Sequence, residues 1–507
     1  MDTGHLNELC RRAIQRMDAD DFRGALAIAY KLKSLGPHYL VSYVCSGLLI
    51  DVGVAIEDES VVREGLELLQ GDLQSIGRNK QYAPTAYYNL ANGHYGLFRF
   101  AVARDPYVAC FQETSLDEAK AYYRRALGYG LEDDMLRSQI WTNLGNCFDH
   151  LGRVIDALEC YNEALQWKSD HGMALGNKGQ ALMNYSVVAG EHQGTFLIEA
   201  HSLLSRALEL GLPTEAINSF SKHIANIREH FPDRQALENP PEYPGCRIET
   251  RSAFERFLIE FCLENRLYLN MCDFCQKCDA AIGDTASIKK MIVSVSTEKD
   301  RDLMKENIYL RLSAYLNQIK QDYVAARFLL ILSRYKGINI DFVDEHVKIV
   351  DTGDQSVHNI RVQLVRASFR NFYDILDKIA CFLDDYLQLG IPERKIDFRR
   401  LWYTKGNLLR NRIKKMKSLS LNALFDIHRD FENGPYKELR LIRNALTHRF
   451  VTVRKSQEVE NWENMTEETL VRHTLDLSRV VRNAILYLLH FVYLEEDKKE
   501  TAYFSPR

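Results

Sequence analysis

A spacing of large and small residues that recurs along the first half of the chain constrains its fold more than any other feature. Its clearest copy has large residues where two helices would share a groove and small ones where they would cross: Trp141, Leu144, Gly145, Phe148, Gly152, Ala157, Tyr161 and Ala164. Matching residue types return 34 residues later at Leu175, Gly179 and Leu182. A repeat of this length predicts pairs of helices that bury their apolar faces by stacking on neighbouring pairs.

These repeats resemble the tetratricopeptide family over residues 1–230, which implies a helical solenoid with a concave groove. Asn89, Asn143 and Asn177 share one repeat position, and Asn92 and Asn146 share another, three residues later. Residues three and four apart are neighbours on a helix, so these amides are predicted to form a ladder. Either the ladder binds the backbone of a protein or peptide partner, or the amides hydrogen-bond between adjacent repeats.

The remaining chain also reads as helical, so the predicted fold class is all-α. Four prolines in residues 231–250 predict a linker. Residues 251–355 are expected to form a helical connecting region, and residues 356–507 a helical bundle. No apolar run reaches the ~20 residues of a membrane span, and a net charge of -4 gives no general attraction for nucleic acid.

The 11 cysteines lie mostly within apolar helical patterns, and no apolar leader opens the chain. Both observations favour reduced thiols and a cytoplasmic location. Cys272, Cys275 and Cys278 have the spacing of metal ligands. Because no second Cys/His pair follows at the distance of a zinc finger, we predict no metal site and no other cofactor.

Two long apolar seams predict an antiparallel four-helix bundle at the C-terminal end. The first seam alternates steps of three and four residues through Val362, Val365, Phe369, Phe372, Leu376, Ile379, Leu383 and Tyr386, and the second runs through residues 467–494. Two shorter helical segments lie between them.

A basic segment at residues 393–418 lies between the first seam and the shorter helices. It contains Arg399, Arg400, Lys405, Arg410, Arg412, Lys414, Lys415 and Lys417, with Trp402 and Tyr403 among them. Positive charge with interleaved aromatic rings indicates a surface for RNA or another polyanion, on which the rings would stack. The alternative is a basic helix that only faces solvent.

The stretch LRLIRNALTHRFV, residues 439–451, carries polar groups on an amphipathic helix. At 100° per residue, its core arc is predicted to contain Leu439, Ile442, Leu446 and Phe450. His448 then points away from this core, and Arg443 lies about 140° from His448. A second copy of the helix across a two-fold axis would cover the outer face, which includes Leu441, and bring two such pairs together.

Arg443 at the margin of the core requires a carboxylate, and Asp374 and Asp377 on the first seam are the expected partners. The run from Arg443 through Asn444 to His448 matches the Arg-x4-His motif of the HEPN superfamily of helical bundles, to which residues 360–495 are similar. The upstream charged pair of Asp377 and Lys378 supports the resemblance. Fusion to tetratricopeptide repeats resembles prokaryotic conflict and antiviral defence proteins.

The resemblance implies a metal-independent endoribonuclease that acts as a homodimer. His448 would transfer a proton, Arg443 would stabilise charge on the phosphate, and Asn444 would orient a phosphate oxygen or His448. Asp374, Asp377 and Lys378 would support them. The alternative is a non-catalytic tetratricopeptide adaptor whose bundle serves dimerisation or the binding of nucleotide or RNA.

Overall fold

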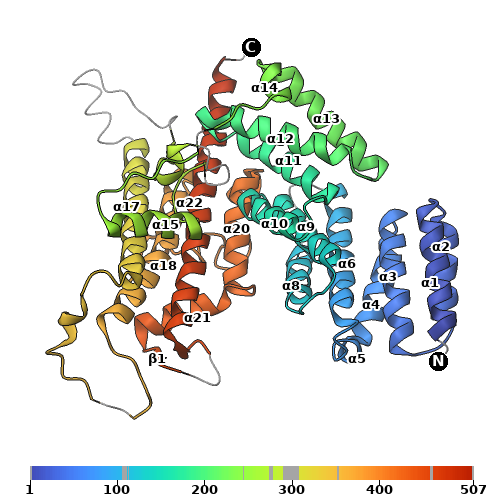
Figure 1. The fold of residues 1–507 in the computed structure, drawn as a ribbon, viewed down its shortest axis with the longest axis horizontal. Helices are drawn as coiled ribbons and strands as arrows, with labels where there is room; N and C mark the ends of the chain where they lie inside the picture. Colours follow the sequence, from blue (N-terminus) through green and yellow to red (C-terminus); the bar gives the residue numbers. More distant parts are fainter. Residues whose placement is uncertain are drawn as a thin grey trace. The chain divides into compact units, whose positions relative to one another are not determined.

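Helices make up nearly all of the regular structure in this computed structural model (Figure 1). It describes residues 3–104, 111, 114–243, 245–272, 278–288, 308–350, 353–456 and 461–504. Two compact units divide the chain. The N-terminal unit consists of Met1–Tyr185 and Leu197–Glu238, and the C-terminal unit of Ser186–Phe196 and Asn239–Arg507. The predicted all-α fold class is confirmed.

Consecutive helices of the N-terminal unit pair as the repeats predict: α3 packs on α4, α6 on α8, and α9 on α10. The helices up to the end of this unit are α1 (Thr3–Asp18), α2 (Phe22–Lys33), α3 (Tyr39–Ala55), α4 (Glu59–Gly71), α5 (Leu73–Ile76), α6 (Ala83–Arg104), α8 (Ser115–Leu127), α9 (Asp134–His150), α10 (Val154–Trp167), α11 (Gly172–Ser186), α12 (Gln193–Leu208), α13 (Thr214–His230) and α14 (Arg234–Glu238). The short helix α14 lies within the range predicted as a linker.

Small residues permit the close helix crossings, as their place in the repeat predicts. A Cβ atom on Gly145 of α9 would come within 2.6 Å of the Tyr161 ring on α10. On α11, a Cβ on Gly179 would come within 2.8 Å of Leu204 on α12. Any larger residue at either glycine would force the paired helices apart.

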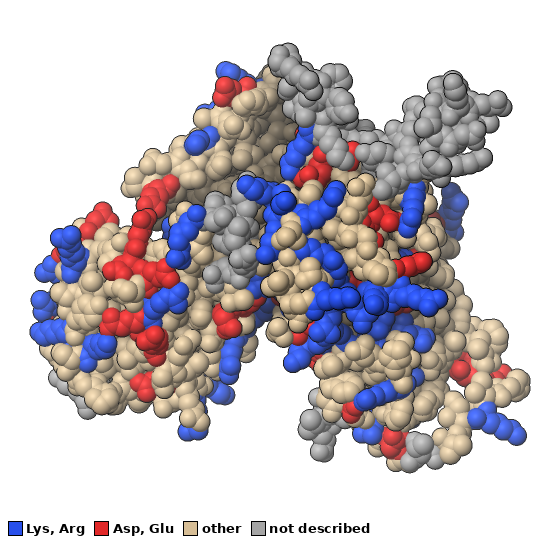
Figure 2. All heavy atoms as spheres, turned by 180° about the vertical axis from the view of Figure 1, so that it is seen from behind, with Lys and Arg blue, Asp and Glu red and all other residues tan. Residues whose placement is uncertain are grey.

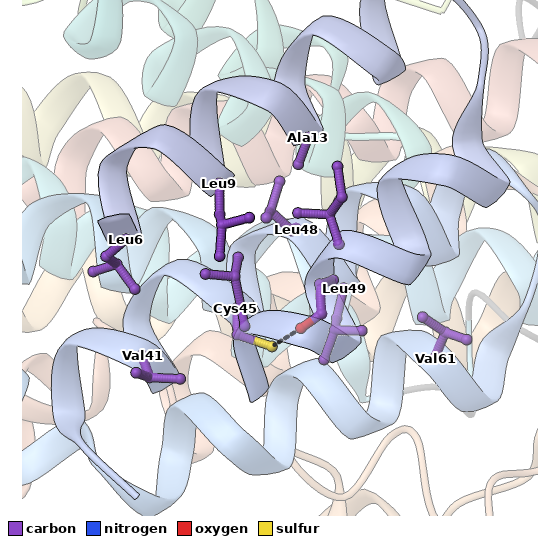
Figure 3. Packing of buried hydrophobic residues seen from close by; sticks show 11 residues of the cluster. Leu6, Leu9, Ala13, Val41, Cys45, Leu48, Leu49 and Val61 are labelled. Atoms are coloured by element: carbon purple, nitrogen blue, oxygen red, sulfur yellow. Dashed lines mark hydrogen bonds between the residues drawn. The ribbon is translucent and has the colours of Figure 1, made fainter. Parts of the chain in front are cut away.

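The first four helices share one apolar core (Figure 3). Leu9, Leu49 and Leu32 are almost completely buried in it. The buried Cys45 thiol donates a hydrogen bond to the Ala29 carbonyl at 3.2 Å. This packing is that of a structural cysteine, and burial raises its pKa to about 11.

The long helices α18 and α22 form the centre of the C-terminal unit. α18 packs against α17, α21 and α22, and α20 packs against α21 and α22. The regular elements of the C-terminal unit are η1 (Gly190–His192), α15 (Ala253–Asn265), η2 (Asp279–Ile282), α17 (Ile308–Arg334), η4 (Asp341–Asp344), α18 (Ile360–Leu387), η5 (Glu393–Lys395), α19 (Asn411–Lys415), α20 (Leu419–Glu432), α21 (Lys437–His448), β1 (Thr452–Arg454), β2 (Asn464–Thr466) and α22 (Glu467–Phe504).

The predicted seam on α18 is buried from Val362 to Leu383. Helix α17 packs along α18 as well, so the bundle contains one more helix than the four predicted. Ser368 donates to the Ala326 carbonyl at 2.8 Å, and the rings of Tyr323 and Phe372 are 5.3 Å apart. The apolar spacing of this stretch predicted a helix within the connecting region, residues 251–355, and the structure packs that helix against α18.

Two local features go beyond the predicted helices. Strands β1 and β2 pair in parallel, with Thr452 opposite Asn464. Among the described residues, α22 is the one helix long and apolar enough to cross a membrane, and 83% of its most apolar window is buried inside the protein. Burial of this extent is also what the core helix of a bundle shows.

Candidate active site on helix α21

The apolar face of helix α21 enters the bundle, Arg443 lies half-buried at the margin of that face, and the other motif residues face solvent. Leu439 and Ile442 are buried as predicted, whereas Asn444 and His448 are exposed. The helix ends at His448 because the backbone of Arg449 leaves the helical region, with φ -138° and ψ -137°. The helical angle predicted for Phe450 therefore does not apply, and this residue is 79% exposed. Its assignment to the core was wrong.

Leu446 is also only half-buried, so its predicted place deep in the core was wrong as well. Ala445, one residue earlier, is 2% exposed and fills that position against the bundle. The small side chain of Ala445 lets α21 approach its neighbours closely. The core arc is thus rotated slightly from the predicted one.

Arg443 lies beside both carboxylates that the sequence analysis expected. Its Nη2 atom is 3.8 Å from an oxygen of Asp374 and 3.8 Å from an oxygen of Asp377. The two aspartates are three residues apart on α18 and so face the same side of that helix. The other oxygen of Asp377 accepts a hydrogen bond from the backbone amide of Phe398 at 2.9 Å. This bond fixes one carboxylate next to the guanidinium.

The guanidinium of Arg443 uses few of its five N–H donors. Among the described residues, its one hydrogen bond is a long contact of 3.5 Å from Nη1 to Asn444 Oδ1. Its Nε is buried and has no hydrogen-bond partner among the described residues. The ring of Tyr373 lies beneath it, 5.2 Å from its central carbon. The cation is held in position, yet most of its donors are not used.

Burial governs the electrostatics around Arg443. It raises the pKa of the Asp374 and Asp377 carboxyl groups, while the charge of Arg443 acts in the opposite direction on both. Burial also raises the pKa of the Tyr373 hydroxyl. Tyr373 and Asp377 are half-buried, whereas the Asp374 side chain is 58% exposed, so the guanidinium lies between the bundle and solvent.

Lys378 does not join Arg443 as the predicted supporting residue would. It forms an ion pair with Asp322 of α17 instead. The lysine follows Asp377 by one residue, which is 100° around α18 and turns it towards α17. Its role is to connect these two helices.

Among the contacts that the described residues make with Arg443, the ring of Tyr373 was not predicted from the sequence. It lies on α18 four residues before Asp377 and directly before Asp374. Residues four apart share a helix face, so this spacing was the available signal.

Most of the predicted RNA-binding residues lie on the surface. Figure 2, which views the molecule from behind Figure 1, shows Lys and Arg side chains gathered in a band on the C-terminal unit. Of the predicted RNA-binding residues, six are exposed: Arg399, Arg400, Lys405, Arg412, Lys415 and Lys417. The other two, Arg410 and Lys414, are half-buried. Arg410 donates to the Leu401 carbonyl at 2.8 Å, so it stabilises its own loop. Arg399 and Arg400 form ion pairs with Glu432 and Asp397, at 3.3 and 3.5 Å.

The aromatic residues of this segment are not the stacking surfaces that were predicted. Trp402 is fully buried, with its ring centroid 5.3 Å from that of Phe425 and 6.2 Å from that of His428. Tyr403 is half-buried and packs on the same two residues. Both rings belong to the core because the segment folds as a loop over α20 rather than as a solvated helix.

The amide ladder of the N-terminal unit joins neighbouring repeats. Asn143 donates to Asn92 at 3.2 Å, and Asn177 donates to Asn146 at 2.8 Å. Tyrosines add to it: the Tyr123 hydroxyl donates to Asn92 at 2.7 Å, and the Tyr161 hydroxyl donates to Asn146 at 2.9 Å. Asn89, which lies against Gly47, makes no such bond to a described residue. Four of the five asparagines therefore form hydrogen bonds between adjacent repeats, which was one of the two predicted roles of the ladder. The other role, binding of a peptide, stays a prediction.

Residues 304–495 match the family model of the LA2681-like HEPN domain. The C-terminal unit contains a HEPN domain. The matched range begins before α17 and includes it in the HEPN domain, together with Arg443 and His448. Residues 138–171 match the tetratricopeptide repeat and span the pair α9 and α10 around Trp141. No match was found among curated proteins.

The two matches carry a coarse functional statement. A HEPN domain suggests a ribonuclease or nucleotide-binding role, with RNA binding or dimerisation, and a tetratricopeptide repeat suggests interaction with other proteins.

Proposed function

We propose that the HEPN domain is a metal-independent endoribonuclease whose active site forms across a homodimer. The repeat unit would bind a regulatory or partner protein. The observation that carries this proposal is the state of Arg443, a positioned cation whose donors are mostly unused among the described residues, on the same helix as an exposed histidine. A guanidinium in that state can donate to a phosphate without first losing strong bonds.

The proposed reaction divides between two kinds of group. His448 takes the proton of an RNA 2′-hydroxyl, whose oxygen attacks the adjacent phosphorus. The bond from phosphorus to the 5′-oxygen breaks, that oxygen takes a proton from water, and a 2′,3′-cyclic phosphate remains, while His448 releases its proton to solvent. Arg443 donates hydrogen bonds to the charged phosphate oxygens as the transition state forms. Asn444, which is exposed and contacts Arg443, would orient one of these oxygens.

The homodimer follows from the geometry of α21. Arg443 and His448 are separated by about 140° around the helix, so one copy does not direct both groups at one phosphate. The half-buried Leu441 lies about 20° from His448 around the helix and gives that side an apolar residue. A second copy of α21 across a two-fold axis would cover these residues and bring arginine and histidine from different chains together.

The alternative is a non-catalytic domain that binds nucleotide or RNA. The two carboxylates next to Arg443 favour it, because negative charge repels phosphate. At 3.8 Å, however, neither makes a close hydrogen bond with the guanidinium.

A cleavage assay separates the two functions. The purified full chain is incubated with total RNA in buffer without Mg²⁺ or other added divalent ions, beside His448→Ala, Arg443→Ala and the control Lys437→Ala, which removes an exposed charge from the same helix. We expect the wild type and the control to cut RNA to 2′,3′-cyclic phosphate ends. Each site variant should be slower by about 100-fold or more. Wild-type protein that binds RNA but leaves it intact would establish the alternative, and cutting that persists in both variants would overturn the site.

A further inference from the structure

Three metal-binding side chains converge in the C-terminal unit, outside the site on α21. The imidazole of His192 and the thiols of Cys272 and Cys278 place their ligand atoms within 4.8 Å of one another. Cys272 is buried, and the other two are half-buried. His192 precedes Cys272 by 80 residues. The absence of a metal site was predicted because no second Cys/His pair follows the cysteines in the sequence, and this prediction did not consider residues that precede them. Cys275 lies outside the described residues, and the site is defined without it.

Hydrogen bonds among the described residues before Cys272 and after Cys278 fix the positions of both ends. The fully buried Asn270, two residues before Cys272, donates to the carbonyls of Ala281 and Gly283 at 3.0 and 2.9 Å. Asp284 accepts from the Leu269 amide at 2.8 Å and pairs with Arg327 of α17 at 2.7 Å. The two thiols are therefore presented by a fixed frame on both sides.

His192 comes to the thiols from a segment that packs with the same unit. Residues Ser186–Phe196 belong to the C-terminal unit although they lie between α11 and α12 in the sequence. The Tyr243 hydroxyl donates to Thr195, three residues after His192, at 3.4 Å. The histidine is the last residue of η1, so its backbone is also ordered.

The distances agree with a tetrahedral zinc ion. Two thiolates, each about 2.3 Å from one tetrahedral zinc, are about 3.8 Å apart. The sulfur atoms of Cys272 and Cys278 are 3.8 Å apart. A disulfide would require a separation of about 2.05 Å. A hydrogen bond between two thiols would explain the sulfur pair but not the imidazole that approaches both.

We propose that His192, Cys272 and Cys278 bind a structural zinc ion. Soft thiolates with an imidazole are a ligand set that zinc prefers, and they fill three of its four tetrahedral positions. The ion would connect residues 186–196 to the two cysteines. Binding of the ion would add to the stability of the C-terminal unit, because the three ligands converge only in the folded chain.

Metal content of the purified full chain tests the proposal. After purification with zinc and dialysis, mass spectrometry of the metal should find about one zinc per chain. His192→Asn, Cys272→Ser and Cys278→Ser should each lose most of it, whereas the matched thiol control Cys381→Ser on α18 should retain it. Wild-type protein without zinc, or full zinc in all three variants, would overturn the site.

A measurement on wild-type protein covers the case in which the variants fail to fold. Cys278 is half-buried, as is the comparison thiol Cys381. Removal of zinc should increase alkylation of Cys278 by N-ethylmaleimide while the rate for Cys381 stays constant. Equal alkylation rates of Cys278 with and without zinc would contradict zinc binding. A disulfide between Cys272 and Cys278 in reducing buffer would also contradict it. Both readouts are independent of RNA cleavage, so the two proposals fail separately.

Discussion

The amide ladder of the repeats and the Arg443 site of the HEPN domain show two fates of polar side chains on helices. From the sequence, the amides of the ladder and Arg443 were each a candidate for binding a ligand. In the ladder, Asn143 donates to Asn92 and Asn177 donates to Asn146, so these amides satisfy one another. Arg443 has only one long hydrogen bond and a buried Nε without a partner among the described residues.

This difference separates a structural role from a ligand-binding one. A side chain whose bonds are complete within the fold must break them to bind a ligand, and each such bond contributes about 1 kcal/mol. A side chain held by packing and charge with unused donors has no such cost. The ladder is therefore expected to stabilise the solenoid, and Arg443 to act on an anion.

The largest effect is expected from Arg443→Lys. The lysine retains the charge but loses the planar fork that donates two hydrogen bonds to a phosphate. Cleavage of RNA should fall by about 100-fold, with little change in the melting temperature. The control Arg440→Lys alters the neighbouring arginine, which pairs with Glu432 at 2.9 Å, and should change cleavage only a few-fold. Equal activity of Arg443→Lys and wild type would place Arg443 among the structural groups.

Acidification should destabilise the HEPN domain. Burial lowers the pKa of His428 and of His490 from the ordinary 6.5 to about 3. Below pH 6.5 the unfolded chain binds protons that the folded chain excludes, so the free energy of unfolding falls as the pH decreases. At pH 5 each histidine should remove about 2 kcal/mol.

Denaturant unfolding between pH 7.5 and 5 measures this loss. His428→Gln should reduce the pH dependence, and the exposed control His358→Gln should leave it unchanged. A slope identical in all three proteins would show that His428 is not kept neutral by the fold.

Periodicity predicted much of this fold because helices α18 and α21 bury residues at regular steps. The seam of α18 follows that rule from Val362 to Leu383. The pairing of Arg443 with Asp374 and Asp377 could be expected since a cation at a core margin needs a carboxylate.

Where the chain leaves a helix, periodicity carries no information. Phe450 follows the end of α21 and is exposed, and Trp402 lies in a loop and is buried. His192 was missed for a different reason. Its contact with two cysteines depends on how distant segments fold together, and no local spacing encodes that.

A moderate effect is expected in the repeats from Asn143→Ala. The change removes the donor to Asn92 Oδ1 and to the Tyr88 hydroxyl, both at 3.2 Å. The free energy of unfolding should fall by about 1–2 kcal/mol, while RNA cleavage stays at the wild-type rate.

Asn89→Ala is the matched control, at the same repeat position without a ladder bond. It should cost less than about 0.5 kcal/mol. If the two variants were equally stable, the ladder would contribute nothing, and its amides would be available to a peptide.

The smallest effect is expected from Lys405→Ala, which removes one exposed charge of the basic segment. RNA binding is measured over a range of salt concentrations in the His448→Ala background, so that the RNA is not cut. The slope of log affinity against log salt should fall by about 1. Lys348→Ala, an exposed lysine outside the segment, should leave the slope unchanged. Equal slopes would remove Lys405 from the RNA surface.

Mixing two inactive variants tests most directly whether the site forms between chains. Arg443→Ala and His448→Ala are unfolded together in equal amounts, refolded and assayed on RNA. If one chain supplies the arginine and its partner the histidine, half of the dimers are mixed and each has one intact site, so about a quarter of the wild-type activity should return. Mixed dimers, verified by mass, that remain as inactive as either variant alone would contradict a site shared across the homodimer.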